Sequence, residues 1–239
     1  MDRDLKLEAV TLEYQNHGKN TMVCQSLSVT FPEKKVSVIL GPSGVGKTTL
    51  LNFIAGHFAG EGTITFQGKR LDSLPPSERE IAYVTQDFRL YPHMTVFENI
   101  AFPLHVLRAP REEIEKRVNA MASRLGISYF LSRKPRALSG GQQQKVALAK
   151  ALIWEPSLLL LDEPFSDLDP QSRQECRLFF KETLLHASFT TLLVTHSWDD
   201  AMTLADRVYL LHQGKIAFEG TPYEAECSAY APYFSEVRP

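Results

Sequence analysis

The sequence of 239 residues predicts an α/β fold with a mainly parallel sheet, an N-terminal antiparallel β subdomain and an inserted helical subdomain. Three observations lead to this prediction. Apolar runs of strand length alternate with helix-like segments in the first and last parts of the chain, which is typical of parallel sheets with right-handed crossovers. Within residues 5–31 apolar residues are spaced by two, as in half-buried strands. From Phe88 to Trp154 apolar residues instead recur at helical spacing, and no convincing strand pattern is present.

The N-terminal third is predicted to hold strands on either side of one short helix. Turn-forming residues 16–18 separate the first two segments, which are expected to pair as antiparallel strands. Glycines 56, 60 and 62 end the helix, and Pro75-Pro76 marks a surface turn. The expected elements are strands around Leu5 and around Val29, a strand over 36–40, a helix over 47–55, a strand between Gly62 and Gly68, and a strand over 81–85.

The remaining two thirds are predicted to begin with helices and to return to alternating strands and helices. Ser139 is a suitable N-cap for a helix that includes Val146 and Leu152. Pro170 occupies a favoured first-turn position, and Gln213-Gly214 predicts a hairpin turn. The expected elements after residue 155 are a buried strand over 158–161, a helix from 170 to about 186, a strand over 191–195, a helix over 198–205, and strands over 208–211 and 216–218.

Composition excludes several classes of protein. The formal net charge is −2, which argues against general nucleic-acid binding through a basic surface, so no nucleic-acid partner is expected. The three cysteines are widely spaced and predict neither a disulfide framework nor a zinc site, which fits a reducing, cytosolic setting. The longest apolar runs have the length of strands and no apolar signal core is evident, so contact with a membrane is expected to go through a partner.

The strand over 36–40 and the helix over 47–55 flank a glycine-rich loop that fits the pattern G-x-x-x-x-G-K-[ST]. In this pattern, successive backbone N–H groups converge on a phosphate, and a lysine and a hydroxyl complete the cradle. The helix start adds its positive dipole end. An ordinary glycine-rich turn would not need a lysine followed by two threonines. The candidate nucleotide-binding residues are Gly41, Pro42, Ser43, Gly44, Val45, Gly46, Lys47, Thr48 and Thr49.

Two adjacent carboxylates, Asp162 and Glu163, follow the buried strand over 158–161. The carboxyl ends of parallel strands are where ligands bind in open α/β sheets. In phosphate-loop nucleotidases an Asp at this place helps to hold Mg²⁺ together with the loop Ser/Thr, so Asp162 and Thr48 are candidate metal ligands. Glu163 is then free to polarise a water molecule against the γ-phosphate. The alternative is a solvated acidic pair at a strand end.

Leu138-Ser139-Gly140-Gly141-Gln142 resembles the signature sequence of ATP-binding cassette (ABC) ATPases. The other motifs of that family fall in the same order: the phosphate loop, Gln86, the signature, residues 158–164, residues 166–169 and His196. The resemblance covers essentially the whole chain and implies a P-loop NTPase (RecA-like) core. It implies a single ABC ATPase domain over 1–239, with 1–86 and 156–239 as the nucleotide-binding core and 87–155 as the helical signature subdomain.

The resemblance also implies ATP and Mg²⁺ as cofactors and gives individual residues their roles. Tyr14 matches the aromatic residue that stacks on adenine, the alternative being a packed strand tyrosine. Gln86 resembles the residue that senses Mg²⁺ and the attacking water, which makes it both a catalytic and a metal candidate. His196 resembles the histidine that contacts the γ-phosphate. The expected catalytic residues are Glu163, Gln86 and His196.

The signature implies a second subunit. A helix that begins at Ser139 offers another anion-binding end, and one phosphate cannot easily satisfy two helix starts of one monomer. In the family, two subunits pack head to tail, so that Ser139, Gly140, Gly141 and Gln142 contact the ATP held by the partner's phosphate loop. Asp169 resembles the residue that couples the two sites. Lys145 and Lys150 stand where relatives usually carry arginines, so helper contacts can differ.

Residues 86–100 are similar to the equivalent stretch of bacterial importer ATPases that serve solute-binding-protein systems; alternatively, their apolar residues only pack the helical subdomain. The leading hypothesis is an ATPase subunit that works as a homodimer beneath membrane permease subunits, on the cytoplasmic face of the cell membrane. The alternatives are an exporter ATPase, or a soluble mechanical ATPase acting on DNA or ribosomes. The latter is disfavoured by the lack of a coiled-coil insertion, a second cassette or a basic excess. The chain ends soon after residues 220–222, so no additional regulatory domain is expected.

Overall fold

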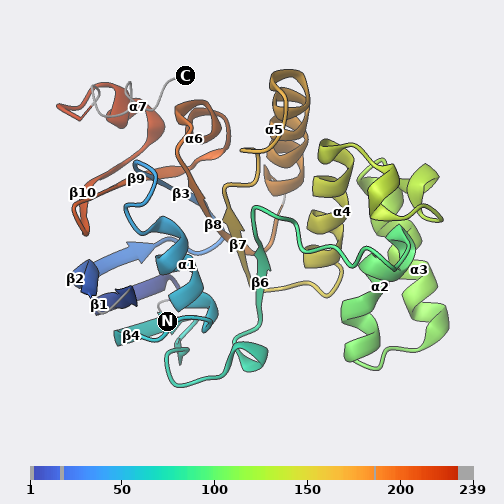
Figure 1. Cartoon of the computed structure of the whole chain (residues 1–239), viewed down its shortest axis with the longest axis horizontal. Coiled ribbons are helices and arrows are strands. Elements are labelled where there is room, and N and C mark those ends of the chain that lie inside the picture. Colours follow the sequence, from blue (N-terminus) through green and yellow to red (C-terminus); the bar gives the residue numbers. More distant parts are fainter. Residues whose placement is uncertain (1–2, 17–18, 186, 231–239) are drawn as a thin grey trace.

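The computed structural model describes residues 3–16, 19–185 and 187–230. In these residues the strands form two sheets (Figure 1). The larger sheet has the order β10-β9-β3-β8-β7-β6 and is parallel except for β10, and the smaller sheet, β2-β1-β4-β5, is antiparallel. The strands are β1 Leu5–Asn16, β2 Lys19–Phe31, β3 Val36–Leu40, β4 Glu61–Phe66, β5 Lys69–Arg70, β6 Ile81–Val84, β7 Leu158–Asp162, β8 Thr190–Thr195, β9 Arg207–His212 and β10 Lys215–Gly220.

Helices cover the larger sheet on both faces. The α-helices are α1 Lys47–Ala55, α2 Val96–Val106, α3 Arg111–Arg124, α4 Gly140–Leu152, α5 Pro170–Leu185, α6 Trp198–Leu204 and α7 Pro222–Glu226. Side chains of β7 alternate between two cores: Leu158 and Leu160 pack with α1 and the antiparallel sheet, whereas Leu159 and Leu161 pack with α4, α5 and α6. All five residues of β7 are therefore buried, as expected for a parallel strand covered on both faces.

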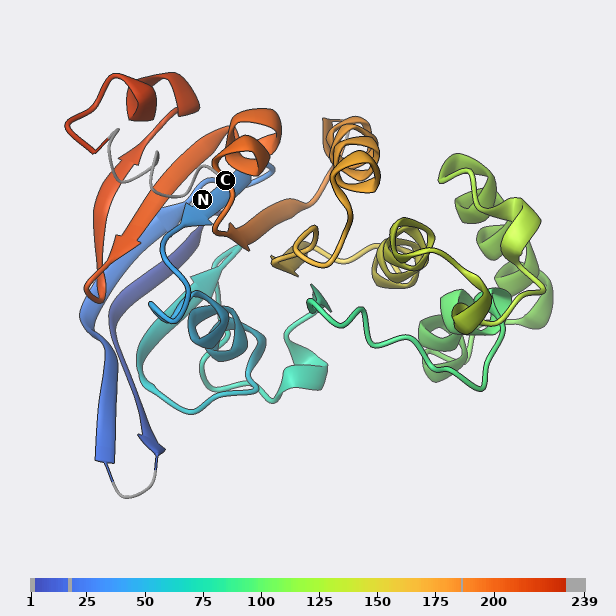
Figure 2. The same cartoon turned by 45° about the horizontal axis from the view of Figure 1, so that its top comes forward.

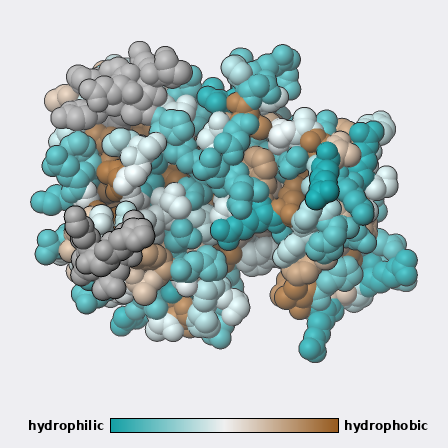
Figure 3. Space-filling model, in the orientation of Figure 1, coloured by the Kyte–Doolittle hydropathy of each residue, from teal (hydrophilic) through white to brown (hydrophobic). Residues whose placement is uncertain are grey.

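A third core lies among α2, α3 and α4, and Ile100, Val118 and Val146 are among its buried residues. Figure 2 shows α2 and α3 on the side away from the two sheets, with α4 between them and the larger sheet. The face seen in Figure 3 is mostly hydrophilic, with small and scattered hydrophobic areas, so the apolar residues of all three cores are largely inside. None of the helices in the described part of the chain is long and apolar enough to cross a membrane.

The predicted α/β class is confirmed, and most elements lie within one or two residues of their predicted bounds. The hairpin turn between β9 and β10 has positive φ at both Gln213 (48°) and Gly214 (72°), which is the geometry that a two-residue hairpin favours. Helix α2 lies inside the stretch 88–154 that was predicted to be helical but was not predicted as a separate element, and it contains Pro103. The Thr95–Glu98 capping box at its start is the signal that could have found it. The predicted turn residues 17 and 18 and the predicted helix end at 186 lie outside the described residues.

Candidate functional site

The glycine-rich loop runs from β3 to α1 in close contact with its neighbours. A Cβ atom on Gly41 would lie 2.6 Å from the Leu211 carbonyl oxygen, and one on Gly46 would lie 2.2 Å from Val23 Cγ1. Gly46 also has a φ of 106°, which favours glycine. Because Gly46 is the N-cap of α1 and has no side chain to cap it, the first-turn N–H groups are left for a ligand. The loop therefore has the geometry of an anion-binding helix start.

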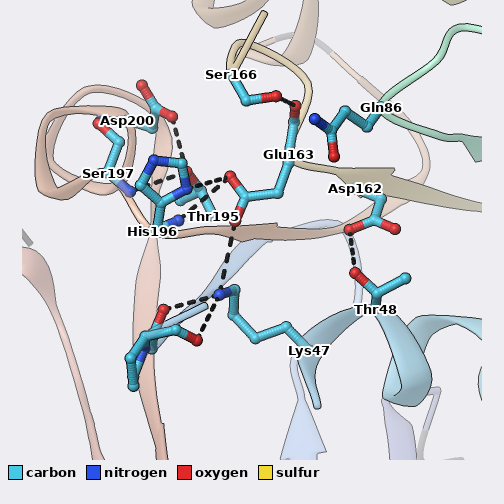
Figure 4. A network of polar contacts seen from close by, with 12 residues as sticks. Lys47, Thr48, Gln86, Asp162, Glu163, Ser166, Thr195, His196, Ser197 and Asp200 are labelled. Carbon is cyan, nitrogen blue, oxygen red and sulfur yellow. Dashed lines mark hydrogen bonds and ion pairs between the residues drawn. The ribbon is translucent and has the colours of Figure 1, made fainter. Parts of the chain in front are cut away.

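The Lys47 side chain folds back into this loop and is only 6% exposed. Its Nζ donates hydrogen bonds to the carbonyl oxygens of Gly41 (2.7 Å) and Pro42 (3.1 Å), and lies 3.6 Å from Glu163 Oε1. Burial lowers the pKa of Lys47, and the nearby Glu163 carboxylate partly offsets this shift. The ammonium group is thus held at the centre of the loop, next to the end of β7 (Figure 4).

Thr48 and Asp162 meet at the same place. Thr48 Oγ1 donates to Asp162 Oδ1 at 2.9 Å, and the Tyr83 hydroxyl donates to Asp162 Oδ2 at 3.0 Å. Burial raises the pKa of the Asp162 carboxyl. Mg²⁺ usually takes one or two protein oxygens and completes its shell with water and substrate phosphates. A hydroxyl and a carboxylate side by side at the start of α1 fit that donor set, and Tyr83, which the sequence did not single out, orients the carboxylate.

Glu163 lies between Lys47 and His196. Its Oε2 is 2.8 Å from His196 Nδ1 and accepts a longer hydrogen bond, 3.4 Å, from the His196 backbone N–H. An ionised carboxylate only accepts, so Nδ1 carries the hydrogen in this pair. Glu163 has a φ of 45°, and Ser166 Oγ donates to its carbonyl oxygen at 2.9 Å. A non-glycine residue with this backbone conformation is uncommon and is typical of functional sites.

A buried ion pair supports the turn that carries His196. Arg177 Nη2 lies 2.6 Å from Asp200 Oδ1, and the Asp200 side chain is 3% exposed. Thr195 Oγ1 donates to the other carboxylate oxygen of Asp200 at 2.9 Å, and Ser197 caps α6 by accepting from the Asp200 N–H. Sequence reasoning missed Arg177 and Asp200, although the Ser197-x-x-Asp200 spacing is a helix-start pattern that points to the second of them.

Gln86 lies at the end of β6 on the same side as Asp162 and Glu163 (Figure 4). Its Nε2 donates to Asp167 Oδ1 at 3.2 Å. Asp169 is used differently in this structure: its Oδ1 accepts from the Ser172 N–H at 3.1 Å at the start of α5, and hydrogen bonds from Ser172 lower its pKa. These contacts tie Gln86 to Asp167, in the segment that follows Glu163, and give Asp169 a helix-capping role.

Ser139 caps α4, as predicted, through a capping box with Gln142. A Cβ on Gly140 would lie 2.9 Å from Leu168 Cδ2, and one on Gly141 would lie 3.1 Å from Cys176 Sγ. The two glycines therefore also let α4 pack against the segment before α5 and against α5 itself. From the sequence, glycine was expected only to leave this helix start accessible. The close packing is a second reason for glycine at these two positions.

Tyr14 lies on β1 opposite Thr21, and its side chain is 38% exposed. A ring this accessible is available for stacking, so its proposed contact with adenine stays a prediction. An open pocket of about 650 Å³ adjoins the glycine-rich loop. It is lined by residues of β2, by Gly44 and Val45, and by the β9–β10 turn.

Comparison with known proteins gives the class to which this site belongs. A family model described as "ABC transporter" matches residues 24–166, and the chain belongs to that family. The chain is 43% identical over 217 residues to the molybdate/tungstate import ATP-binding protein WtpC of Pyrococcus abyssi, covering 90% of this chain and 62% of the relative. It is 46% identical over 203 residues to the sn-glycerol-3-phosphate import ATP-binding protein UgpC of Paracoccus denitrificans, covering 84% and 58%.

The fold resembles a solved structure described as the dimeric post-hydrolysis state of the ATP-binding cassette MJ0796 bound to ADP and Pi. The TM-score is 0.80 at 30% identity, and the match covers 91% of this chain and 98% of that one. The chain spans about three fifths of the length of the curated relatives named above, 62% and 58%.

Proposed function

We propose that this chain is the ATP-hydrolysing subunit of an ABC transporter that drives solute import across a membrane. The observation that carries the proposal is the position of the Glu163 carboxylate. It lies between the Lys47 ammonium and the His196 ring, at the strand end that also brings Asp162 to Thr48. One helix start thus brings together the groups that bind phosphate, the oxygen ligands for Mg²⁺ and the carboxylate that activates water.

In this proposal, residues 41–49 bind the phosphates of ATP through the Lys47 ammonium and through their backbone N–H groups, Pro42 having none. Thr48 and Asp162 hold Mg²⁺, which when bound neutralises phosphate charge, and Gln86 is placed to sense it. The Glu163 carboxylate accepts a hydrogen bond from the attacking water and so orients and polarises it. His196 holds Glu163 through Nδ1, which leaves its other ring nitrogen, Nε2, to contact the γ-phosphate. Tyr14 stacks on adenine.

The site is completed by a second copy of the chain. In the structure the capping box uses the N–H groups of Ser139 and Gln142, so a ligand at this helix start would meet the Ser139 hydroxyl and the N–H groups of Gly140 and Gly141. We place Ser139, Gly140, Gly141 and Gln142 on the ATP of the partner in a head-to-tail homodimer, with Asp169 coupling the two sites. The dimeric state of the MJ0796 structure supports this arrangement.

The helical residues 87–155 act as a signature subdomain within a single domain, 1–239, whose core is 1–86 and 156–239. The separate core among α2, α3 and α4 supports this division. The import relatives support membrane permease subunits as partners, a solute-binding protein in the same system, and a place at the cytoplasmic face of the cell membrane. Co-purification with an integral membrane protein is the expected outcome, and ATPase stimulation by DNA or ribosomes would favour the mechanical alternative.

The test is Glu163→Gln, because it removes the charge that polarises water and leaves the phosphate cradle intact. The variant is expected to bind ATP, to lose most of its turnover and to accumulate as a dimer on gel filtration with ATP, whereas the wild type returns to monomer as it hydrolyses. Turnover at the wild-type level in Glu163→Gln would remove Glu163 from the mechanism.

A further inference from the structure

The segment that follows Gln86 has an unfavourable backbone. Phe88 and Arg89 are consecutive non-glycine residues with positive φ, 57° and 42°. Only short local hydrogen bonds hold their N–H groups, from Phe88 to Thr85 O and from Arg89 to Asp87 O. Such a conformation persists only where the surrounding structure holds it. Gln86 comes just before these strained residues, and its side chain donates to Asp167. A change in the conformation of residues 88–89 would therefore move the backbone that carries Gln86.

Lys150, near the end of α4, contacts this loop directly. Its Nζ donates to the Arg89 carbonyl oxygen at 2.9 Å and lies 4.0 Å from the centre of the Tyr91 ring. Burial lowers the pKa of Lys150, so the ammonium group has given up part of its hydration to reach this position. A charged donor on a carbonyl and a cation over an aromatic face both hold the half-buried ammonium here, although Arg89 itself is exposed.

Asn99 of α2 holds the same loop from the other end. This residue is fully buried; its Oδ1 accepts from the Tyr91 N–H at 2.7 Å and its Nδ2 donates to the Tyr91 carbonyl oxygen at 3.1 Å. The two side chains hold different residues: Asn99 fixes the backbone of Tyr91, whereas Lys150 reaches Arg89, the second of the two strained residues that follow Gln86. Lys150 therefore joins α4 to the part of the loop on which the position of Gln86 depends.

We infer that Lys150 is a positioning residue that holds the loop 86–91 in its strained conformation and so keeps Gln86 in the place where it contacts Asp167, on the Glu163 side of the site. The inference rests on the proposed function for its effect on hydrolysis. Helix α4 begins at Ser139, so Lys150 also ties the signature helix to the Gln86 loop of its own subunit. A neutral side chain of similar length at position 150 would free the loop without removing any group that touches nucleotide.

The first test needs no nucleotide. Amide hydrogen exchange of residues 86–94 is compared in the wild type, Lys150→Met and Lys150→Arg. Lys145→Met is the matched control, because Lys145 is on the same helix and its Nζ lies over a different ring, that of Phe179 on α5, at 4.5 Å. Exchange is expected to be about tenfold faster in Lys150→Met, since a hydrogen bond from a charged donor is lost. It is expected to be unchanged in Lys145→Met and largely restored in Lys150→Arg.

The second test is steady-state hydrolysis by the same proteins. Lys150→Met is expected to lower kcat about tenfold and to raise the Mg²⁺ concentration for half-maximal rate, with KM for ATP little changed. Unchanged exchange, or faster exchange with an unchanged kcat, overturns the inference. A wild type that does not hydrolyse ATP instead overturns the proposed function, while the exchange test still decides whether Lys150 holds the loop. If Lys150→Met does not fold, Tyr91→Leu removes the ring from the other side of the contact and is measured in the same way.

Discussion

Arg79 allows a direct test of how the end of α1, the helix that follows the phosphate loop, is stabilised. Its side chain is 7% exposed, and it donates from Nη1 to the carbonyl oxygens of Phe53 (2.9 Å) and Ile54 (2.7 Å), and from Nε to that of Leu74 (2.9 Å). Phe53 and Ile54 belong to the last turn of α1, whose carbonyls lack intrahelical partners. Burial lowers the pKa of Arg79, so the guanidinium is kept there by these acceptors.

The perturbation is Arg79→Met, which keeps an unbranched side chain and removes the donors. Phe53 O also accepts from the Gly56 N–H, so the main loss falls on Ile54 O and Leu74 O. Each buried acceptor left without its donor costs about 1–3 kcal/mol. Removing a buried charge offsets part of this loss, which leaves a decrease of about 2–4 kcal/mol in the free energy of unfolding. For a chain of this size, that corresponds to a fall in Tm of roughly 10 °C.

The assay is thermal unfolding of Arg79→Met beside Arg70→Met. Arg70 is the matched control, because its guanidinium pairs with Asp72 at 2.6 Å but is 64% exposed, and exposed pairs contribute little. A fall in Tm in Arg79→Met no larger than that of the control would refute the assignment of Arg79 as the group that caps α1.

Two further predictions concern the phosphate loop and the helical subdomain. Lys47→Ala is expected to abolish ATP binding in a nucleotide titration, because Lys47 supplies the ammonium at the centre of the loop; near-normal affinity would contradict the proposed cradle. Hydrogen bonds from the Thr95 backbone N–H and hydroxyl lower the pKa of Glu98 in the folded state. The ionised Glu98 therefore stabilises the folded state fully above the ordinary pKa of about 4.3. This stabilisation is lost as pH falls through the lower pKa of the folded state. The Tm difference between wild type and Glu98→Gln, which keeps the capping box but cannot titrate, should therefore be present at pH 7 and shrink below about pH 4; a difference independent of pH would show that ionisation of Glu98 does not matter.

Much of the fold could be predicted because its signals are local. The first four residues of β7 are leucines because the strand is covered on both faces. Gly56 and Ser139 mark a helix end and a helix start by their own backbone chemistry. The motifs around Lys47 and Glu163 could likewise be found from spacing alone, and the structure brings them within 3.6 Å of each other.

The contacts that hold the site in place could not be predicted, because they join segments far apart in the sequence. Arg177 reaches Asp200, Arg79 reaches the end of α1, and Lys150 reaches Arg89 across 61 positions. Arginine and lysine are usually exposed, and a single such residue carries no local sign of burial. Helix α2 lies inside the stretch predicted to be helical, but its bounds were not predicted. It contains Pro103, and its residues Val96, Ile100 and Leu104 are buried at helical spacing.

The central claim is that Lys47 and Ser139 belong to the same site only when they come from two copies of the chain. Equal amounts of Lys47→Ala and Ser139→Ala, each inactive alone, should regain ATPase activity on mixing. About one quarter of the wild-type level is expected, because half of the dimers are mixed and each mixed dimer has one complete site. Absence of activity in a mixture shown to contain mixed dimers would contradict the head-to-tail arrangement.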